Sequence, residues 1–218
     1  MVKSLLLDLD NTVYPSSSKI NEGIDQRMIQ FVSDFLHVDF ESARKLRSER
    51  KKKFGTTLEW LQKEHGLTDV NAYLWAVHPE SEVSELAPIP GLKEFFESIP
   101  LPMAILTNGP DFHAKRVLDF YQISHCFIGV HDIIENKLKG KPNPSAYLKA
   151  LNDSNFKLEE TLFIDDYPKY VYGYISMGGT GVLIDPVDKY ADYKFSTKGK
   201  LCTIKTIYEL PSLFTNSI

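Results

Sequence analysis

Two aspartates near the start of the chain have the type and spacing for metal and phosphate chemistry. Asp8 and Asp10 are separated by one residue and follow the apolar run 5–7. A carboxylate in such surroundings is costly unless a cation or hydrogen-bond donors meet it. Mg²⁺, a hard cation that prefers oxygen ligands, is the simplest such partner. Alone, the pair could equally be a turn or cap at the end of a strand.

Three further groups of polar residues follow in order along the chain. Two of them come directly after apolar runs, and one lies in a loop. These groups are Thr107–Asn108, Lys141 and Asp165–Asp166. Four carboxylates together call for a cation, while hydroxyl, amide and ammonium groups can bind phosphate oxygens. The whole set therefore predicts phosphoryl transfer, in which an aspartate can serve as the nucleophile.

The pattern of apolar residues predicts the elements that position these groups. From residue 88 onwards, strands alternate with helices, which is typical of right-handed βαβ units and a parallel sheet. The unbroken apolar run before Asp8 is typical of a strand buried on both faces of that sheet. Ligands bind at the carboxyl ends of such strands. The predicted fold class is α/β, with a Rossmann-like parallel sheet core.

Residues 16–87 interrupt this alternation with a wholly helical stretch. Because the stretch follows the first strand, it is an insertion that would stand over the predicted site as a cap. The predicted domains are an α/β core of residues 1–15 and 88–218 and an all-helical cap of residues 16–87. Within the cap, helices are expected at about 20–36, 40–53, 56–66 and 69–77, with Asn21, Asp39 and Thr56 as caps.

The polar groups resemble, in sequence and in order, the four motifs of the haloacid dehalogenase-like superfamily of phosphohydrolases. The resemblance extends over nearly the whole chain, and the inserted helices resemble the helical cap of that superfamily's phosphatases. More narrowly, Asp10–Tyr14 and Phe54–Leu58 look like the pyrimidine 5'-nucleotidase branch. The resemblance implies a phosphatase with a haloacid dehalogenase-like core, acting on a small phosphorylated metabolite such as a pyrimidine nucleoside 5'-monophosphate.

The resemblance also implies a two-step hydrolysis. Asp8 would attack the phosphorus and become phosphorylated. Asp10 would protonate the leaving oxygen and then activate water. Thr107 would bind phosphate oxygens and Lys141 would neutralise charge, so the implied catalytic residues are Asp8, Asp10, Thr107 and Lys141. Nearby Lys139 is a poorer match than Lys141, because the Lys-Pro-Asn-Pro context belongs to the latter.

The implied cofactor is Mg²⁺. It would be held by Asp8, by the backbone carbonyl of Asp10 and by Asp166, with Asp165 close by or acting through water. The implied substrate-binding residues are Leu9, Thr107, Asn108, Gly109 and Lys141. The chain departs from the pattern after the acid pair: Tyr167 stands where relatives often have a small residue, and Tyr170 where they have an asparagine.

Other functions remain possible at this point. The substrate could instead be a sugar phosphate or phosphoglycolate. A haloacid dehalogenase shares the fold and the nucleophile but needs neither a metal nor a second acid, so Asp10 and Asp166 argue against it. A phosphomutase could use the same scaffold. A non-enzymatic phospho-acceptor would combine similar groups, but Asp10 supplies the acid–base function that dephosphorylation needs.

Residues outside the motifs invite less specific interpretations. His113 could reach the rim of the site, but a surface position on a helix is favoured. Trp60 and Trp75 are expected in the core of the helical insertion. Tyr14 would touch substrate or pack under the cap. The basic residues of segment 44–53 are expected to form a solvated helix face rather than a polyanion-binding surface.

Composition limits the partners. The 218 residues carry a formal net charge of -4 and 43% hydrophobic content, enough for a full core and without the basic field typical of nucleic-acid binding. No apolar run approaches the roughly 20 residues that span a membrane. No leader is recognised before the first strand, so a cytoplasmic location is expected, with Cys126 and Cys202 as buried free thiols.

Overall fold

The computed structural model describes residues 1–50, 53–191 and 199–215. Its centre is a parallel sheet of six strands in the order β3-β2-β1-β4-β5-β6. The strands are β1 (Ser4–Leu7), β2 (Met103–Leu106), β3 (Phe127–His131), β4 (Thr161–Asp165), β5 (Thr180–Ile184) and β6 (Lys200–Ile204). The strand order reverses at β1, which lies between β2 and β4. Such a switch point is where open α/β sheets bind ligands.

Strand β1 is buried on both of its faces, as predicted. Leu5 and Leu7 belong to one hydrophobic cluster, and Leu6 between them belongs to another. This alternation follows from the two-residue period of a strand. Because side chains from both sides cover it, β1 forms the rigid centre from which the following residues project.

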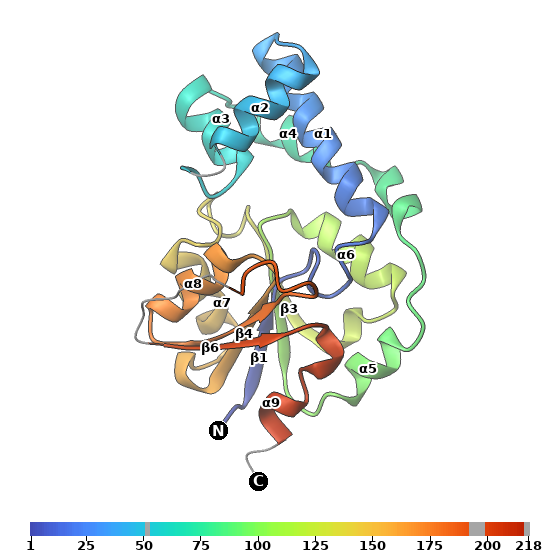
Figure 1. The fold of residues 1–218 in the computed structure, drawn as a ribbon, viewed down its shortest axis with the longest axis vertical. Coiled ribbons are helices and arrows are strands. Elements are labelled where there is room, and N and C mark those ends of the chain that lie inside the picture. The colour runs from blue at the N-terminus through green and yellow to red at the C-terminus, as the bar shows by residue number, and fades with distance from the viewer. Residues whose placement is uncertain (51–52, 192–198, 216–218) are drawn as a thin grey trace.

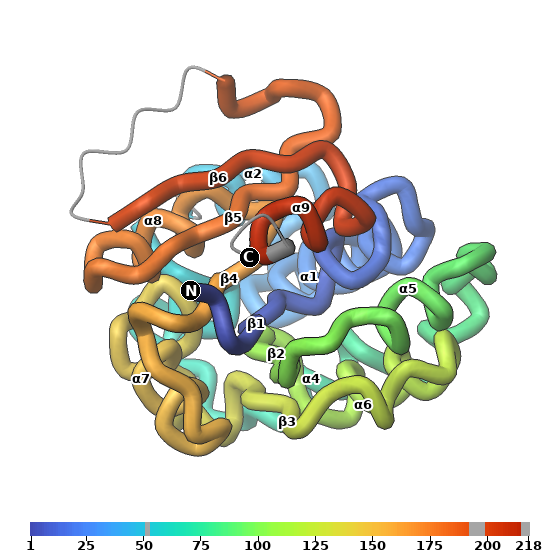
Figure 2. Tube along the Cα trace, turned by 90° about the horizontal axis from the view of Figure 1, so that it is seen from below, coloured from blue at the N-terminus to red at the C-terminus, as the bar shows by residue number. Residues whose placement is uncertain are grey.

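Helices cover both faces of the sheet. Figure 2 shows α7 and α8 on one side of the strands and α5, α6 and α9 on the other. Their bounds are α5 (Leu92–Ser98), α6 (Asp111–Phe120), α7 (Pro144–Asp153), α8 (Pro168–Ser176) and α9 (Ser212–Thr215). Short 3₁₀ helices are found at Ser124–Cys126, Leu158–Glu160 and Ile207–Glu209. The predicted α/β fold class is confirmed.

The regular elements described between β1 and α5 are all helices. This stretch comprises α1 (Lys19–Leu36), α2 (Phe40–Arg50), α3 (Thr57–His65), α4 (Val70–Val77) and the 3₁₀ helix Glu80–Glu85. Figure 1 shows α1 to α4 grouped beyond the carboxyl ends of the strands. Aromatic residues pack these helices together. For example, the ring of Phe31 in α1 packs edge-on against the ring of Tyr73 in α4, with 5.0 Å between the ring centroids.

Most of the predicted helix caps are found. The backbone N–H of Glu59 donates to the Thr56 hydroxyl at 3.0 Å, and α3 ends at Gly66 in the left-handed region. Asp39 accepts from the backbone of Ser42 at the start of α2. The Thr56 and Asp39 side chains accept from backbone N–H groups that the first turn of a helix leaves unpaired.

One prediction about these helices is wrong. Asn21 does not cap α1, which begins at Lys19 with Ser18 as its N-cap. The Asn21 side chain instead accepts a hydrogen bond from the Tyr14 hydroxyl at 3.3 Å, a contact between segments that helical periodicity does not reveal. Helix α2 is described over Phe40–Arg50, and Lys53 lies in a turn; residues 51 and 52 of the predicted helix lie outside the described residues.

Side-chain burial corrects two further expectations. Trp60 is buried, but Trp75 is 48% exposed and stacks on Phe112 of α6 at 4.2 Å between ring centroids. Helix α4 buries the face that carries Tyr73, Leu74 and Val77, so Trp75 points away from it. The two cysteines are free but only partly buried. In the described part of the chain, no helix has the length and apolar character needed to cross a membrane.

Candidate active site

The sheet brings the predicted polar groups to one place. Asp8 follows β1, Thr107 follows β2 and Asp165 ends β4, and these three strands are neighbours. Backbone hydrogen bonds continue the pairing beyond β1, because the N–H of Asp8 donates to the carbonyl of Ile164 at 2.8 Å. The positions of these side chains are therefore set by the sheet.

A cavity of about 280 Å³ lies at these strand ends, and residues of the inserted helices also line it. Six predicted site residues line this cavity: Asp8, Asp10, Thr107, Asn108, Gly109 and Asp166. The other three lie behind them. Leu9 buries its side chain in the core, which leaves only its backbone for a ligand. Lys141 and Asp165 are buried beneath the cavity wall.

Lys141 lies between two carboxylates. Its Nζ donates to Asp8 and, at 2.7 Å, to Asp165, and its side chain is fully buried. Burial alone would lower the pKa of Lys141, but the two carboxylates outweigh burial and raise that pKa. The lysine is therefore a permanent positive charge beside Asp8. Lys139, the weaker match, is exposed.

The side chain of Asn108 holds the loop that carries Lys141. Its Nδ2 donates to the Lys141 carbonyl at 2.9 Å, and its Oδ1 accepts from the Lys141 backbone N–H at 2.7 Å. This pair of bonds ties the end of β2 to the loop. Sequence reasoning placed Asn108 among the substrate-binding residues and did not foresee this structural contact.

Replacing Asn108 with alanine removes both bonds and leaves two backbone groups without this partner. We expect the free energy of unfolding to fall by about 1–3 kcal/mol, because part-buried groups lose their hydrogen bonds. Urea denaturation of Asn108→Ala measures this loss. The exposed Asn152→Ala is the matched control and should change stability by no more than about 0.5 kcal/mol. Equal stability of the two variants would contradict the proposed clamp.

Three carboxylates are crowded around the single ammonium group of Lys141. One oxygen each of Asp8, Asp165 and Asp166 lies within 4.8 Å of the others. Burial and the neighbouring carboxylates raise all three pKa values, that of Asp166 to about 7, although Lys141 acts in the opposite direction. The Oδ1 atom of Asn11 nearby is buried and has no hydrogen-bond partner among the described residues.

This set of groups fits a divalent cation. The excess of negative charge favours a second positive charge beside Lys141, and oxygen donors alone suit Mg²⁺. Asp165 is occupied by Lys141 and by the backbone N–H of Tyr167 at 2.8 Å. Asp166, by contrast, lines the cavity. Asp8 and Asp166 are therefore the carboxylates best placed to reach a cation there.

Asp10 belongs to a different network from Asp8. Its Oδ1 accepts from the Tyr14 hydroxyl and, at 2.9 Å, from Nε2 of His113. Burial alone would raise the pKa of Asp10, but the charge and hydrogen bond of His113, together with Tyr14, outweigh burial and lower it. Asp10 is thus held as a carboxylate at the edge of the cavity.

His113 is not on the surface, so the expectation favoured for it is wrong. Its side chain is fully buried because α6 turns the face of His113, Ala114 and Val117 inward. The helical spacing of His113 with Ala114 and Val117 is the feature of the sequence that could have predicted its burial. Burial alone would lower the pKa of His113, but the carboxylates of Asp10 and Glu82 outweigh burial and raise it to about 9.

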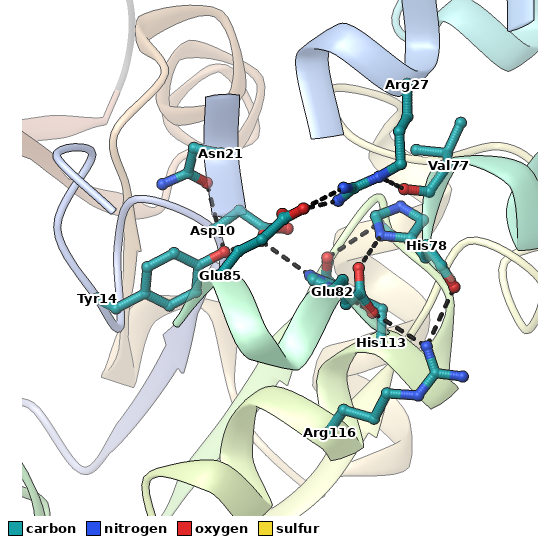
Figure 3. Close-up of polar contacts among 12 residues, drawn as sticks. Asp10, Tyr14, Asn21, Arg27, Val77, His78, Glu82, Glu85, His113 and Arg116 are labelled. Atoms are coloured by element: carbon teal, nitrogen blue, oxygen red, sulfur yellow. Dashed lines mark hydrogen bonds and ion pairs between the residues drawn. The ribbon is translucent and has the colours of Figure 1, made fainter. Parts of the chain in front are cut away.

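Sequence reasoning missed the groups behind His113. Figure 3 shows Glu82 between His78, His113 and Arg116, on the side of His113 away from Asp10. The close contacts with the two histidines overcome the effect of burial and lower the pKa of Glu82 to about 2. No motif or spacing relates this glutamate to Asp10, because the two lie on segments that meet only in the folded chain.

The two departures from the family pattern lie close to the site. The hydroxyl of Tyr170 donates to the carbonyl of Gly55 at 3.1 Å, and its ring centroid is 5.2 Å from Nζ of Lys141. Tyr170 therefore covers Lys141 and connects α8 to the inserted segment. Tyr167 lines the cavity beside Asp166.

The basic segment 44–53 is not wholly a solvated face. Arg44 is largely exposed, but the Arg47 side chain is only 14% exposed, pairs with Asp25 and lines the cavity. The expectation is wrong for Arg47 because α2 packs against α1, where Asp25 lies. Lys51 and Lys52 of this segment lie outside the described residues.

The chain is similar to known proteins in sequence and in fold. Residues 2–169 match the family model of the haloacid dehalogenase-like hydrolases. Phosphate metabolism protein 8 of Saccharomyces cerevisiae is 25% identical over 232 residues, which cover 96% of this chain and 71% of that protein.

Solved structures share the fold. A HAD phosphatase from Thermococcus onnurineus is 19% identical with a TM-score of 0.65, and the match covers 98% of each chain. The L-2-haloacid dehalogenase of Xanthobacter autotrophicus is 16% identical with a TM-score of 0.63 over 100% of each chain. The motif order, the fold and the match over residues 2–169 lead to one conclusion: the chain belongs to the haloacid dehalogenase-like hydrolase family.

Proposed function

We propose that this hydrolase is a Mg²⁺-dependent phosphatase that cleaves a small phosphomonoester through an aspartyl-phosphate. The observation that carries the proposal is the presence of two carboxylates with different partners in one cavity. Asp8 is bound to Lys141, while Asp10 is bound to Tyr14 and His113. Phosphoester hydrolysis needs a nucleophile and a separate acid–base group, whereas dehalogenation needs no second acid. The yeast relative, by its name, is a phosphate metabolism protein.

The proposed reaction has two steps. In the first, a carboxylate oxygen of Asp8 attacks the phosphorus and the ester bond breaks. Asp10, which takes up a proton from solvent when the negatively charged phosphate enters the cavity, gives that proton to the leaving oxygen. In the second, Asp10 as a carboxylate takes a proton from the water that attacks the aspartyl-phosphate. Phosphate leaves, and both side chains return to their starting forms.

The remaining residues stabilise charge during both steps. The buried ammonium of Lys141 offsets negative charge on Asp8 and on the phosphoryl group. The Thr107 oxygen accepts a hydrogen bond from the backbone of Gly109 at 2.9 Å, which leaves its hydroxyl hydrogen to donate to a phosphate oxygen. The backbone N–H of Asn108 is proposed as a second donor.

Asp8, Asp166 and the backbone carbonyl of Asp10 would hold Mg²⁺, with Asp165 acting through Lys141 or water. When bound, the ion offsets charge on the phosphate oxygens. This assignment rests on the excess of carboxylates over ammonium groups around the cavity.

We further propose that residues 16–87 act as a cap domain on a core of residues 1–15 and 88–218, and that the cap selects the substrate. Its helices give the cavity apolar residues, among them Ile24, Met28 and Leu74, together with Arg47. An apolar wall opposite a phosphate site suits a nucleoside. A pyrimidine nucleoside 5'-monophosphate is the proposed substrate, and a sugar phosphate or phosphoglycolate is the alternative.

The test is a phosphate-release screen over nucleoside monophosphates, sugar phosphates and phosphoglycolate, with Mg²⁺ and with a chelator. We expect turnover with Mg²⁺, with pyrimidine nucleotides leading, and none with the chelator. Turnover of a halogenated acid in the presence of chelator, without phosphate release, would favour a dehalogenase instead. A flat substrate profile would overturn only the nucleotidase assignment.

Mg²⁺ binding also has a readout that does not depend on activity. We expect Mg²⁺ to raise the thermal unfolding midpoint, because a ligand that binds only the folded chain stabilises it. Asp166→Asn should abolish this shift. Asp188→Asn is the matched control, because Asp188 is exposed and lies away from the cavity. An equal shift in both variants would contradict the proposed ligand set.

A further inference from the structure

The strongest unexplained feature is a buried group of side chains behind Asp10. It comprises His113 and Arg116 of α6, His78 at the end of α4, and Glu82 in the 3₁₀ helix 80–85. We refer to these four residues as the Asp10 support cluster (Figure 3). None of them is needed to hold phosphate or metal in the proposed reaction, yet they are connected to its acid–base residue.

His113 connects Asp10 to Glu82. Its Nε2 lies 2.9 Å from Oδ1 of Asp10, and its Nδ1 lies 3.0 Å from Oε1 of Glu82. Nε2 donates to the Asp10 carboxylate, whereas Nδ1 faces Glu82 at ion-pair distance and makes no hydrogen bond; the two carboxylates together favour a positively charged ring. A charge-assisted hydrogen bond to Asp10 on one side and an ion pair with Glu82 on the other hold the ring, because turning it would break both at once.

Glu82 is itself held firmly. Its Oε1 also pairs with Arg116 at 3.1 Å, and its Oε2 pairs with Nδ1 of His78 at 3.1 Å. Glu82 and His113 are both 0% exposed. Buried charges are stable only when they are paired. The carboxylates of Asp10 and Glu82 balance the cations of His113 and Arg116.

This balance argues against a metal site. Atoms of His78, Glu82 and His113 lie close enough together to hold a metal ion. However, the guanidinium of Arg116 already supplies positive charge to Glu82, and both nitrogens of His113 already face carboxylates. A metal ion would have to displace these partners.

The hydrogen bonds to Asp10 involve only one of its two carboxylate oxygens. Both of its hydrogen bonds, from Tyr14 and from His113, reach the same oxygen, Oδ1. Among the described residues, none donates to Oδ2, the oxygen near Gly109 at the cavity wall. The carboxyl group is therefore anchored by one oxygen and has the other available for proton transfer.

We propose that Glu82 is a positioning residue that orients the acid–base carboxyl of Asp10 through His113. This inference rests on the proposed function. Glu82 lies in the segment by which the chain returns from the inserted helices to the core. The orientation of Asp10 therefore depends on that segment remaining packed against α6.

The test compares two substrates that differ in how much they need an acid. An alkyl phosphomonoester has a poor leaving group that must be protonated, whereas 4-nitrophenyl phosphate has a good one that leaves without help. The ratio kcat/KM covers the steps up to the aspartyl-phosphate, so it isolates this protonation from the later attack of water.

For Glu82→Gln, we expect kcat/KM to fall by about 10–100-fold for the alkyl ester and by less than about 3-fold for 4-nitrophenyl phosphate, since a positioned acid contributes about 10²–10⁴-fold. Glu85→Gln is the matched control. Glu85 lies in the same 3₁₀ helix and pairs with Arg27 at 2.6 Å, and among the described residues neither member of this pair contacts Asp10 or His113. Glu85→Gln should change kcat/KM by the same factor for both substrates.

His113→Gln provides a second measurement that stands even if Glu82→Gln fails to fold. It should lower kcat/KM much more for the alkyl ester than for 4-nitrophenyl phosphate. The double variant Glu82→Gln, His113→Gln should lose no more kcat/KM than the worse single variant, because both residues act through the contact of His113 with Asp10. Equal losses on both esters in these variants would overturn the inference alone. A wild-type protein that hydrolyses neither ester would overturn the proposed function and the inference with it.

Discussion

Asp8→Asn is expected to lower kcat for phosphomonoester hydrolysis by at least about 10⁴-fold, because removing a nucleophile removes the covalent route. The substitution changes one oxygen for an amide nitrogen and preserves the shape of the side chain. Lys141 keeps its bond to Asp165, so its charge stays paired. Steady-state phosphate release measures the loss, and acid quenching with labelled substrate should detect no phosphorylated protein.

Asp185→Asn is the matched control for Asp8→Asn. Asp185 is also a buried aspartate directly after a strand, here β5, but it accepts hydrogen bonds from the backbone of residues 189 and 190 and does not line the cavity. The kcat of Asp185→Asn for phosphomonoester hydrolysis should remain within about 3-fold of that of the wild type. Substantial turnover by Asp8→Asn, or a comparable loss in Asp185→Asn, would remove Asp8 from the proposed role.

Lys141→Met should have the second largest effect, on activity and on stability together. It leaves Asp8 and Asp165 buried without their shared cation. Loss of one partner from a buried ion pair costs about 3–5 kcal/mol of stability. Loss of a preorganised charge beside a phosphoryl group costs about 10²–10³-fold in kcat. Urea denaturation and phosphate release measure the two effects.

The neighbouring lysine provides the control for this second prediction. Lys139 lies two residues earlier in the same loop and is exposed, so Lys139→Met should change stability by no more than about 0.5 kcal/mol and leave turnover close to that of the wild type. A larger loss in Lys139→Met than in Lys141→Met would exchange the roles proposed for the two residues.

The part of the site that depends on strand ends could be predicted from the chain alone. An apolar run followed by polar residues implies a buried strand and a polar edge. Parallel pairing then brings Asp8, Thr107 and Asp165 together. Lys141 was predicted for a different reason: it lies in a loop, and the local Lys-Pro-Asn-Pro context distinguishes it from Lys139.

The surroundings of Asp10 could not be predicted in this way. His113 is 103 positions further along the chain from Asp10, and Glu82 reaches His113 from a segment that local pattern marks only as the end of the helical insertion. Such contacts arise from the packing of α6 against the 3₁₀ helix 80–85, and packing depends on the whole set of buried side chains.

Sequence by itself therefore determined the fold class, the order of the motifs and the carboxylates that face the cavity, because strand period and local motifs are properties of neighbouring residues. Tertiary structure decided that Asn108 clamps the Lys141 loop, that Arg47 faces the cavity, and that His113 is buried. The physical reason is that burial, and with it the charge and pairing of a titratable group, depends on segments that meet only in the folded protein.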